Sequence, residues 1–149
     1  MASSQERAEA SGFWPPLHKL LGLFIERDGS AESGSRVVLP LGDYARGAVA
    51  PLHGGVLATL IDVACATAID PDSYDPTARL PVSLDLSVRY FRQPTSSPVV
   101  AEARVLNQGS RLIHSECDVK DGDGRLLAHG GGSYMMVDGF GGKASSSSW

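Results

Sequence analysis

The longest apolar run of the chain is GGVLATLIDVACATAI, at residues 54–69. It is rich in Ala and Leu and is interrupted only by Thr59, Asp62 and Thr67. Such a run predicts a helix without a wet face, which the rest of the protein has to enclose. The helix is expected to end at Asp70-Pro71, because proline disfavours helical geometry in the residue before it.

Four strand-like runs follow, at 81–91, 98–107, 110–120 and 125–137. The first alternates between apolar and polar residues, which predicts a half-buried antiparallel strand. Its apolar face would carry Val82, Leu84, Leu86, Val88 and Tyr90, and its polar face Ser83, Asp85, Ser87 and Arg89. Turn residues at 107–109 and 121–124 join the last three runs into a meander.

The segment before the long helix predicts a shorter helix and two strands. Pro15 and Pro16 are tolerated in a first helical turn and can open a helix through Leu20, while 21–26 and 35–42 are typical of strands. The fold class is therefore α+β. An antiparallel sheet of five to six strands has one apolar face to cover, and one helix is apolar enough to cover it, so the sheet is expected to wrap around that helix.

The length and composition suit a single domain. With 149 residues and 42% hydrophobic content, the chain can bury a substantial core without disulfides or metals. We expect the folded domain at residues 13–137. The small and polar residues 1–12 and the Gly- and Ser-rich residues 138–149 are expected to be disordered tails.

Charge and cysteine content exclude several classes of protein. The formal net charge is −4 and the basic residues are scattered, so no nucleic-acid partner is expected. No signal peptide and no apolar stretch of membrane length is present in this sequence, and we expect a cytoplasmic protein. Cys65 and Cys117 are expected to be reduced thiols. His114 and His129 lie on different predicted strands without a second ligand at metal spacing, so no zinc site is expected. No other metal and no cofactor is expected either.

The sequence His53-Gly54-Gly55 stands directly before the long helix. Glycines at a helix start let a ligand approach the unpaired N–H groups of the first turn, where the helix dipole also favours negative charge. The amides of Gly54 or Gly55 could therefore bind a carbonyl oxygen that becomes an oxyanion. The alternative is that the glycines only turn the chain and that His53 is a structural hydrogen-bonding residue.

Asp62 is the second candidate, because it lies in the middle of the apolar helix. An unpaired buried carboxylate is costly, and no Lys or Arg lies three or four residues away. Either a partner comes from elsewhere in the fold, or Asp62 borders a polar pocket and is retained for chemistry. Gly54 and Asp62 are roughly 12 Å apart along a helix. A twofold dimer would bring the glycine end of one helix to the Asp of its neighbour.

Three segments carry a family resemblance: LHGGVLATLIDVACATA, VSLDLSVRYFRQP and VVAEARVLNQGSRLIHSECDVKDGDGRLLAHGGGSYMMV. Together they resemble the phenylacetate-pathway (PaaI-like) type of hotdog-fold acyl-CoA thioesterases over about residues 19–137. The most specific signature is His-Gly-Gly with an Asp nine residues after the His. The resemblance implies a sheet around one long helix, dimers with a continuous sheet, and pairs of dimers as tetramers.

The same resemblance implies the roles of individual residues. The Gly54 amide, aided by His53, would polarise the thioester carbonyl, and Asp62 of the opposing subunit would act as nucleophile or as general base for water. Ser83 matches a residue that orients this water. Relatives often carry an Asn about six residues before the His, whereas this chain has Arg46-Gly47-Ala48. Either the loop is remodelled or part of the electrophilic help is missing.

Cations are needed for the phosphates of CoA. The expected substrate-binding residues are Gly55, Arg89, Arg92 and Arg111, although each arginine could equally be a solvated strand residue. Two other functions stay open from the sequence. One is a hotdog dehydratase or hydratase, which would pair a catalytic His with an Asp or Glu, and the other is a non-catalytic acyl-thioester binder.

Overall fold

A computed structural model describes residues 14–26, 34–71 and 79–138. The tails expected at 1–12 and 138–149 lie outside the described residues, apart from Asp138. The elements are α2 (Pro16–Leu21), β1 (Phe24–Glu26), β2 (Gly34–Leu39), the 3-10 turn η1 (Asp43–Ala45), α3 (Gly54–Ile69), β3 (Leu80–Tyr90), β4 (Val99–Gln108), β5 (Ile113–Lys120) and β6 (Leu126–Val137). Their order confirms the prediction, with η1 as an addition.

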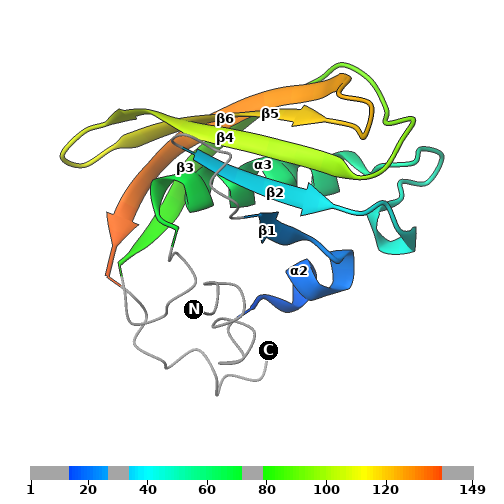
Figure 1. The fold of residues 1–149 in the computed structure, drawn as a ribbon. Helices are drawn as coiled ribbons and strands as arrows, with labels where there is room; N and C mark the ends of the chain where they lie inside the picture. The colour runs from blue at the N-terminus through cyan, green and yellow to red at the C-terminus, as the bar shows by residue number, and fades with distance from the viewer. Residues whose placement is uncertain (1–13, 27–33, 72–78, 139–149) are drawn as a thin grey trace.

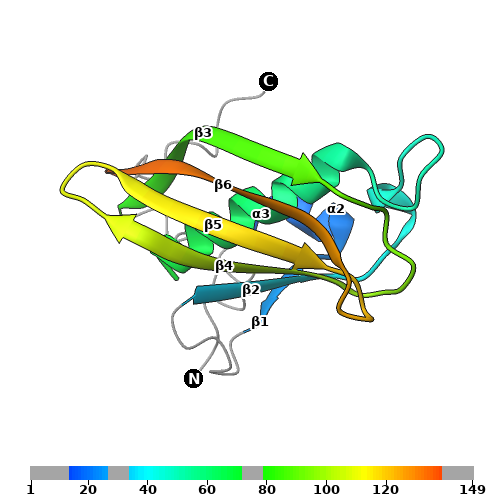
Figure 2. The same cartoon turned by 90° about the horizontal axis from the view of Figure 1, so that it is seen from above.

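The strands form one antiparallel sheet in the order β1-β2-β4-β5-β6-β3. The sheet curves over α3 in Figure 1, and Figure 2 shows α3 running beneath the strands with β3 along one edge. The β4-β5-β6 meander is as predicted. An α+β hotdog arrangement, with the sheet wrapped around one long helix, is thereby confirmed.

The core lies between α3 and the concave face of the sheet. Leu60, Ile61, Ala64 and Cys65 of α3 are fully buried, and alternate residues of the strands pack against them, among them Val99, Val119, Leu127 and Tyr134. This alternation is the consequence of a strand period of two above a single apolar layer. On α3, Ala58, Thr59 and Asp62 are only half-buried. One protomer therefore does not enclose the helix all round.

The predicted bounds of the long helix are correct, whereas two strands begin later than predicted. Helix α3 begins and ends at the predicted residues. The strand predicted at 21–26 begins only at Phe24, because α2 runs to Leu21 and Gly22 then adopts a left-handed φ of 72°. The strand predicted from 110 begins at Ile113, since the Gly109 N–H donates to Leu112 O at 2.8 Å and closes a longer loop.

A β-bulge in β3 corrects the predicted faces of this strand. Ser83 pairs with Tyr134, whereas Asp85 pairs with the adjacent Ser133, so the register shifts by one residue between them. Directly opposite residues of an antiparallel pair share a face. Ser83 therefore lies on the helix face with the buried Tyr134, and Val82 lies on the other face. The predicted placement of Ser83 and Val82 was wrong, because an alternating pattern carries no sign of an inserted residue.

The prediction that β3 is half-buried was also wrong for most of the strand. Leu84 is 52% exposed and Tyr90 is 55% exposed. The reason is the position of β3 at the edge of the sheet, paired only with β6 among the described strands. An edge strand with several exposed apolar side chains is a template for association with another chain.

Candidate functional site

One amide in the first turn of α3 has no acceptor among the residues that the structure describes. The Gly55 N–H donates to His53 Nδ1 at 2.9 Å, and the N–H groups of Val56 and Leu57 donate to His53 O. The Gly54 N–H donates to no acceptor within the described parts of the chain. Of the two amides expected to bind an oxyanion, Gly54 is therefore available, while that of Gly55 is engaged inside the protein.

The same hydrogen bond fixes the ring of His53. Because Nδ1 accepts from the Gly55 amide, the neutral ring carries its proton on Nε2. His53 is exposed, so this Nε2–H can donate to a group outside the protomer. The imidazole thus serves as the N-cap of α3 and also presents a second donor beside the Gly54 amide.

Tyr90 at the end of β3 and Gln93 in the loop after it hold this helix start in place. Tyr90 Oη donates to Gly54 O at 2.9 Å, and Gln93 Oε1 accepts from the Leu52 N–H at 3.0 Å. The sequence pattern assigned Tyr90 only to an apolar face and gave Gln93 no role. No local signal identifies either contact, because the paired residues are 36 and 41 positions apart.

The loop before His53, where an Asn would be expected from the family resemblance, is closed by two backbone hydrogen bonds. The Gly47 N–H donates to Ala50 O at 2.9 Å, and the His53 N–H donates to Ala45 O at 2.7 Å. Arg46 forms an exposed ion pair with Asp43 at 3.6 Å. The loop is thus closed by its own backbone, and its side chains at 46–48 supply no amide donor.

Asp62 has a partner from elsewhere in the fold. Tyr134 Oη donates to Asp62 Oδ1 at 3.1 Å from β6, and Asp62 itself is half-buried. Burial raises the pKa of the Tyr134 phenol far above its ordinary value, and neighbouring Cys65 and Asp62 raise it further. Tyr134 therefore remains protonated and remains a donor. It was missed from the sequence, since 72 positions separate the pair.

Ser83 lies on the side of the sheet that Asp62 faces. Its register partner is Tyr134, which contacts Asp62 directly, so the bulge turns the Ser83 side chain toward the helix. Without the bulge, Ser83 would point to the opposite face. Ser83 therefore shares the helix face of the sheet with Tyr134, the partner of Asp62, and its role toward the attacking water stays a prediction.

The three arginines expected to bind phosphates do not lie together in one protomer. Arg89 lines a shallow hollow of about 680 Å³, and Arg92 is the second residue after the end of β3. Arg111 lies at the β4–β5 hairpin and, with Arg79, lines a second hollow of about 460 Å³. Since Arg92 follows the last residue of β3 and Arg79 precedes its first, the two groups lie at opposite ends of this strand.

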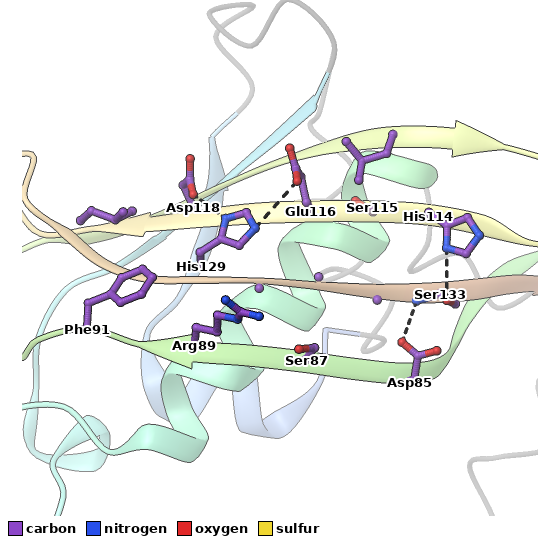
Figure 3. A pocket seen from close by; sticks show the side chains of 15 residues that line it. Asp85, Ser87, Arg89, Phe91, His114, Ser115, Glu116, Asp118, His129 and Ser133 are labelled. Carbon is purple, nitrogen blue, oxygen red and sulfur yellow. Dashed lines mark hydrogen bonds and ion pairs between the residues drawn. The ribbon is translucent and has the colours of Figure 1, made fainter.

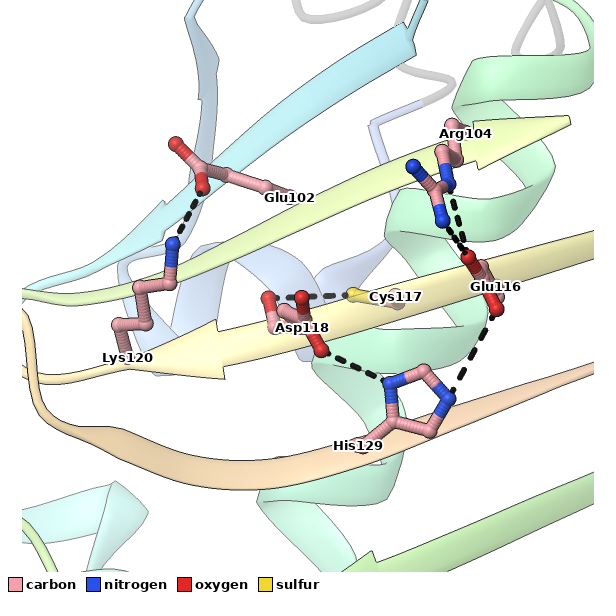
Figure 4. A network of polar contacts seen from close by, with 7 residues as sticks. All are labelled: Glu102, Arg104, Glu116, Cys117, Asp118, Lys120 and His129. Carbon is pink, nitrogen blue, oxygen red and sulfur yellow. Dashed lines mark hydrogen bonds and ion pairs between the residues drawn. The ribbon is translucent and has the colours of Figure 1, made fainter.

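The larger hollow lies on the outer face of the sheet, away from α3. Figure 3 shows Asp85, Arg89 and His129 pointing from the strands, with the helix behind them. This face carries ion pairs, in which Arg104 contacts Glu116 and His129 Nδ1 lies 2.8 Å from Asp118 Oδ1 (Figure 4). Neither hollow is lined by His53, Gly54 or Asp62.

Within the residues that the structure describes, no group of three or more His, Cys, Asp or Glu side chains could hold a metal ion. Across the same ranges, no helix has the length and apolar character needed to cross a bilayer. Cys65 and Cys117 are both free and buried.

Sequence relatives carry esterase names. The chain is 33% identical over 91 residues to a protein of Halobacterium salinarum and 32% identical over 88 residues to a protein of Saccharolobus solfataricus, both named "Putative esterase". These matches cover 57% and 58% of this chain, and 60% and 59% of the relatives. The match therefore spans less than two thirds of each relative.

Solved structures have the same fold. A conserved protein of Pseudomonas aeruginosa is 29% identical with a TM-score of 0.71, covering 85% of this chain and 98% of that one. A Bacillus halodurans protein solved with CoA is 25% identical with a TM-score of 0.71, covering 90% and 83%. The Escherichia coli PaaI protein is 19% identical with a TM-score of 0.72, covering 91% and 94%, a likeness of fold alone.

The family model of the thioesterase superfamily matches residues 51–128. This stretch begins just before the His53-Gly54-Gly55 helix start and includes Asp62, the bulged strand β3 and most of the meander. With more than half of the chain matched and the wrapped sheet confirmed, this chain belongs to the thioesterase superfamily.

Proposed function

We propose that this chain hydrolyses an acyl-CoA thioester to the free acid and CoA, as a PaaI-like hotdog enzyme without a metal or redox cofactor. The observation that carries the proposal is the pair of features on α3: a free Gly54 amide at its start, and the half-buried carboxylate of Asp62. Family membership supports hydrolysis of a thioester, and the CoA in the Bacillus halodurans structure supports the choice of carrier.

The helix start binds the thioester carbonyl. The Gly54 N–H and His53 Nε2–H donate to the carbonyl oxygen and stabilise the negative charge that develops in the tetrahedral intermediate. Both donors are held in advance, His53 by the Gly55 amide and Gly54 by Tyr90. Donors that are already oriented need no reorganisation during the reaction. Gly55 contributes the cap rather than a contact to substrate.

Asp62 supplies the second group of the reaction. As general base, its carboxylate takes a proton from water, the water oxygen bonds to the carbonyl carbon, and the C–S bond breaks as the thiolate receives a proton. As nucleophile, a carboxylate oxygen instead bonds to that carbon, the CoA thiolate leaves, and water then cleaves the anhydride. Ser83, on the same face, orients the water in either route.

A single protomer does not bring these groups to one carbonyl. Gly54 and Asp62 lie roughly 12 Å apart on a continuous helix. We propose that the free edge of β3 pairs antiparallel with β3 of a second copy, which buries the exposed side chains of Leu84 and Leu86. The Tyr90 end of one strand then meets the Leu80 end of the other, and Gly54 approaches Asp62 of the second copy.

The same antiparallel pairing supports the proposed phosphate site. Arg92 lies at one end of β3, and the hollow lined by Arg79 and Arg111 lies at the other. Reversal of the second strand brings these two groups together across the dimer. Arg89 lines the outer face of the sheet and is a weaker candidate for the nucleotide.

Removal of the Asp62 charge tests the proposal. Asp62→Asn is expected to lower the rate of free-thiol release from a panel of acyl-CoAs by about a hundredfold or more, with the melting temperature close to that of the wild type. Asp118→Asn is the matched control, because this carboxylate lies on the outer face and is exposed. Full activity in Asp62→Asn would refute the assigned role.

The two rival functions give different results with the wild-type protein. Hydration of crotonyl-CoA without thiol release would indicate a hydratase, and binding without turnover across the panel would indicate a non-catalytic acyl-thioester binder. The structure favours neither: His129 pairs with Asp118 on the outer face, and His53 has its Nδ1 engaged by Gly55. Neither histidine presents an imidazole–carboxylate pair to the helix side of the sheet.

Complementation tests the shared site. Asp62→Asn and Gly54→Ala chains are each expected to be nearly inactive, yet a mixed dimer retains one site with Gly54 and Asp62 both intact. Random pairing of equal amounts should restore about a quarter of the wild-type activity. Activity no higher than the sum of the two variants would refute a composite site.

Two further expectations stay predictions. Dimers are expected to associate in pairs, which a mass measurement in solution tests. A cytoplasmic location is supported by the free thiols of Cys65 and Cys117, which suit a reducing compartment.

A further inference from the structure

Tyr134 is a buried phenol in the hydrophobic core, and packing of its ring does not by itself require the hydroxyl group. It is 0% exposed and lies on β6 between its register partners Ile113 of β5 and Ser83 of β3. A buried hydroxyl is unfavourable unless it is hydrogen-bonded. Its acceptor is Asp62 Oδ1, at 3.1 Å.

The surroundings of this pair contain few charges. Cys65 lies beside it on α3 and Ser83 is its neighbour on β3, while Ser115 and Cys117 of β5 interact with Cys65. Burial raises the pKa of both thiols, so both are neutral at physiological pH. Glu116, on the outer face, is the other charge that acts on Cys65. Within the described residues, no lysine or arginine forms an ion pair with Asp62.

The hydrogen bond leaves the two oxygens of Asp62 unequal. Oδ1 is held by the phenol, whereas Oδ2 accepts no hydrogen bond from the described residues. Because Tyr134 stays protonated, it donates throughout the working pH range. The carboxylate therefore has one oxygen fixed against the sheet and one available toward the half-open side of the helix.

We propose that Tyr134 is a positioning residue for the thioesterase reaction, which holds Asp62 Oδ1 so that Oδ2 alone receives the proton or the acyl group. This inference rests on the proposed role of Asp62. It assigns a function to a residue that touches the carboxylate and not the substrate. It also explains how a carboxylate without a cationic partner keeps one orientation inside an apolar helix.

Tyr134→Phe tests the inference, because it removes one oxygen atom and keeps the ring that fills the core. We expect kcat to fall about tenfold with KM within about twofold. The rate is taken per folded molecule, with the folded fraction measured on the same preparation, so that a loss of folded protein does not count as a loss of kcat.

Tyr44→Phe is the matched control, since the same atom is removed from a side chain that is 69% exposed. It should leave kcat and KM unchanged. A merely structural role of Tyr134 would lower the melting temperature and the amount of folded protein but would leave kcat per folded molecule unchanged. That outcome would overturn the inference, as would a Tyr134→Phe enzyme with the kcat of the wild type.

The Asp62→Asn variant separates this inference from the proposed function. If Asp62→Asn keeps full activity, the catalytic role of Asp62 fails, and the positioning role fails with it. If Asp62→Asn is inactive and Tyr134→Phe behaves as the wild type, only the positioning role fails. In the Asp62→Asn background, Tyr134→Phe should cause no further loss, because the two residues act through one interaction.

Discussion

Tyr90 Oη donates to the backbone oxygen of Gly54 at 2.9 Å, so the last residue of β3 holds the first residue of α3. A direct hydrogen bond thus connects the edge strand β3 with Gly54, whose amide is available at the helix start. In the proposed dimer, a second copy that pairs with β3 therefore acts on the strand that also holds Gly54, the proposed oxyanion donor. Dimer formation and electrophilic catalysis are expected to be coupled through this contact.

Tyr90→Phe tests the contact between the strand and the helix start. It removes one hydrogen bond at a partly exposed position, which is worth about 0.5–1 kcal/mol. We expect kcat/KM to fall about two- to fivefold, measured as free-thiol release, with little change in the melting temperature. An unchanged kcat/KM would indicate that Tyr90 only packs against Gly54.

Gly54→Ala should change stability and activity in opposite directions. The new Cβ would lie 3.5 Å from the ring of Tyr90, an ordinary contact, and alanine favours a helix over glycine by up to about 1 kcal/mol. The free energy of unfolding should therefore stay the same or rise. The methyl group blocks the approach to the amide, and thiol release should fall about a hundredfold.

Denaturant unfolding and steady-state kinetics on the same preparation check this prediction. A parallel loss of stability and activity would contradict it, because the loss of activity would then follow from misfolding. Gly55→Ala is an informative comparison. Its Cβ would lie only 3.0 Å from His53 Nδ1 and would displace the imidazole.

Leu84→Glu should break the proposed dimer. Leu84 is 52% exposed on the free edge strand, and a charge there opposes strand pairing. We expect a monomer by light scattering and a loss of thiol release of about tenfold or more. Leu20→Glu is the matched control, because Leu20 is 51% exposed but lies on α2. A dimeric and active Leu84→Glu protein would place the interface elsewhere.

The sequence predicts α3 correctly because all of its signals are local. Two glycines at its start, a long and largely apolar run and the Asp70-Pro71 pair each act on neighbouring residues. The candidates His53, Gly54 and Asp62 follow from the same segment. Their chemistry is unusual for their local positions, which is why sequence reasoning finds them.

The features that the sequence misses all depend on pairs far apart in the chain. The bulge that turns Ser83 toward the helix follows from its register with β6, and the bond from Tyr134 to Asp62 joins elements 72 positions apart. Exposure of β3 follows from its place in the strand order. An alternating run indicates that a strand has two faces, but not whether anything covers either of them.

Asp121 predicts a pH dependence of stability. It is a buried residue of the β5–β6 turn and accepts hydrogen bonds from the amides of Thr95, Asp123 and Arg125. Burial by itself raises the pKa of this carboxyl, but the three backbone donors, with the Thr95 hydroxyl, outweigh it and lower the pKa below its usual range. The folded state therefore favours the charged form.

A lowered pKa in the folded state means that this stabilisation is complete above the pKa of the unfolded chain, about 3.9, and is lost as the pH falls through the lower folded value. Asp121→Asn keeps the shape of the side chain but has no charge to lose. The melting temperature of the wild type should exceed that of Asp121→Asn at pH 7, and this difference should become smaller below about pH 4.

Asp123→Asn, at an exposed position of the same turn, is the control and should have the melting temperature of the wild type at every pH. If the difference in melting temperature between the wild type and Asp121→Asn stays constant with pH, the turn depends on the shape of residue 121 and not on its charge.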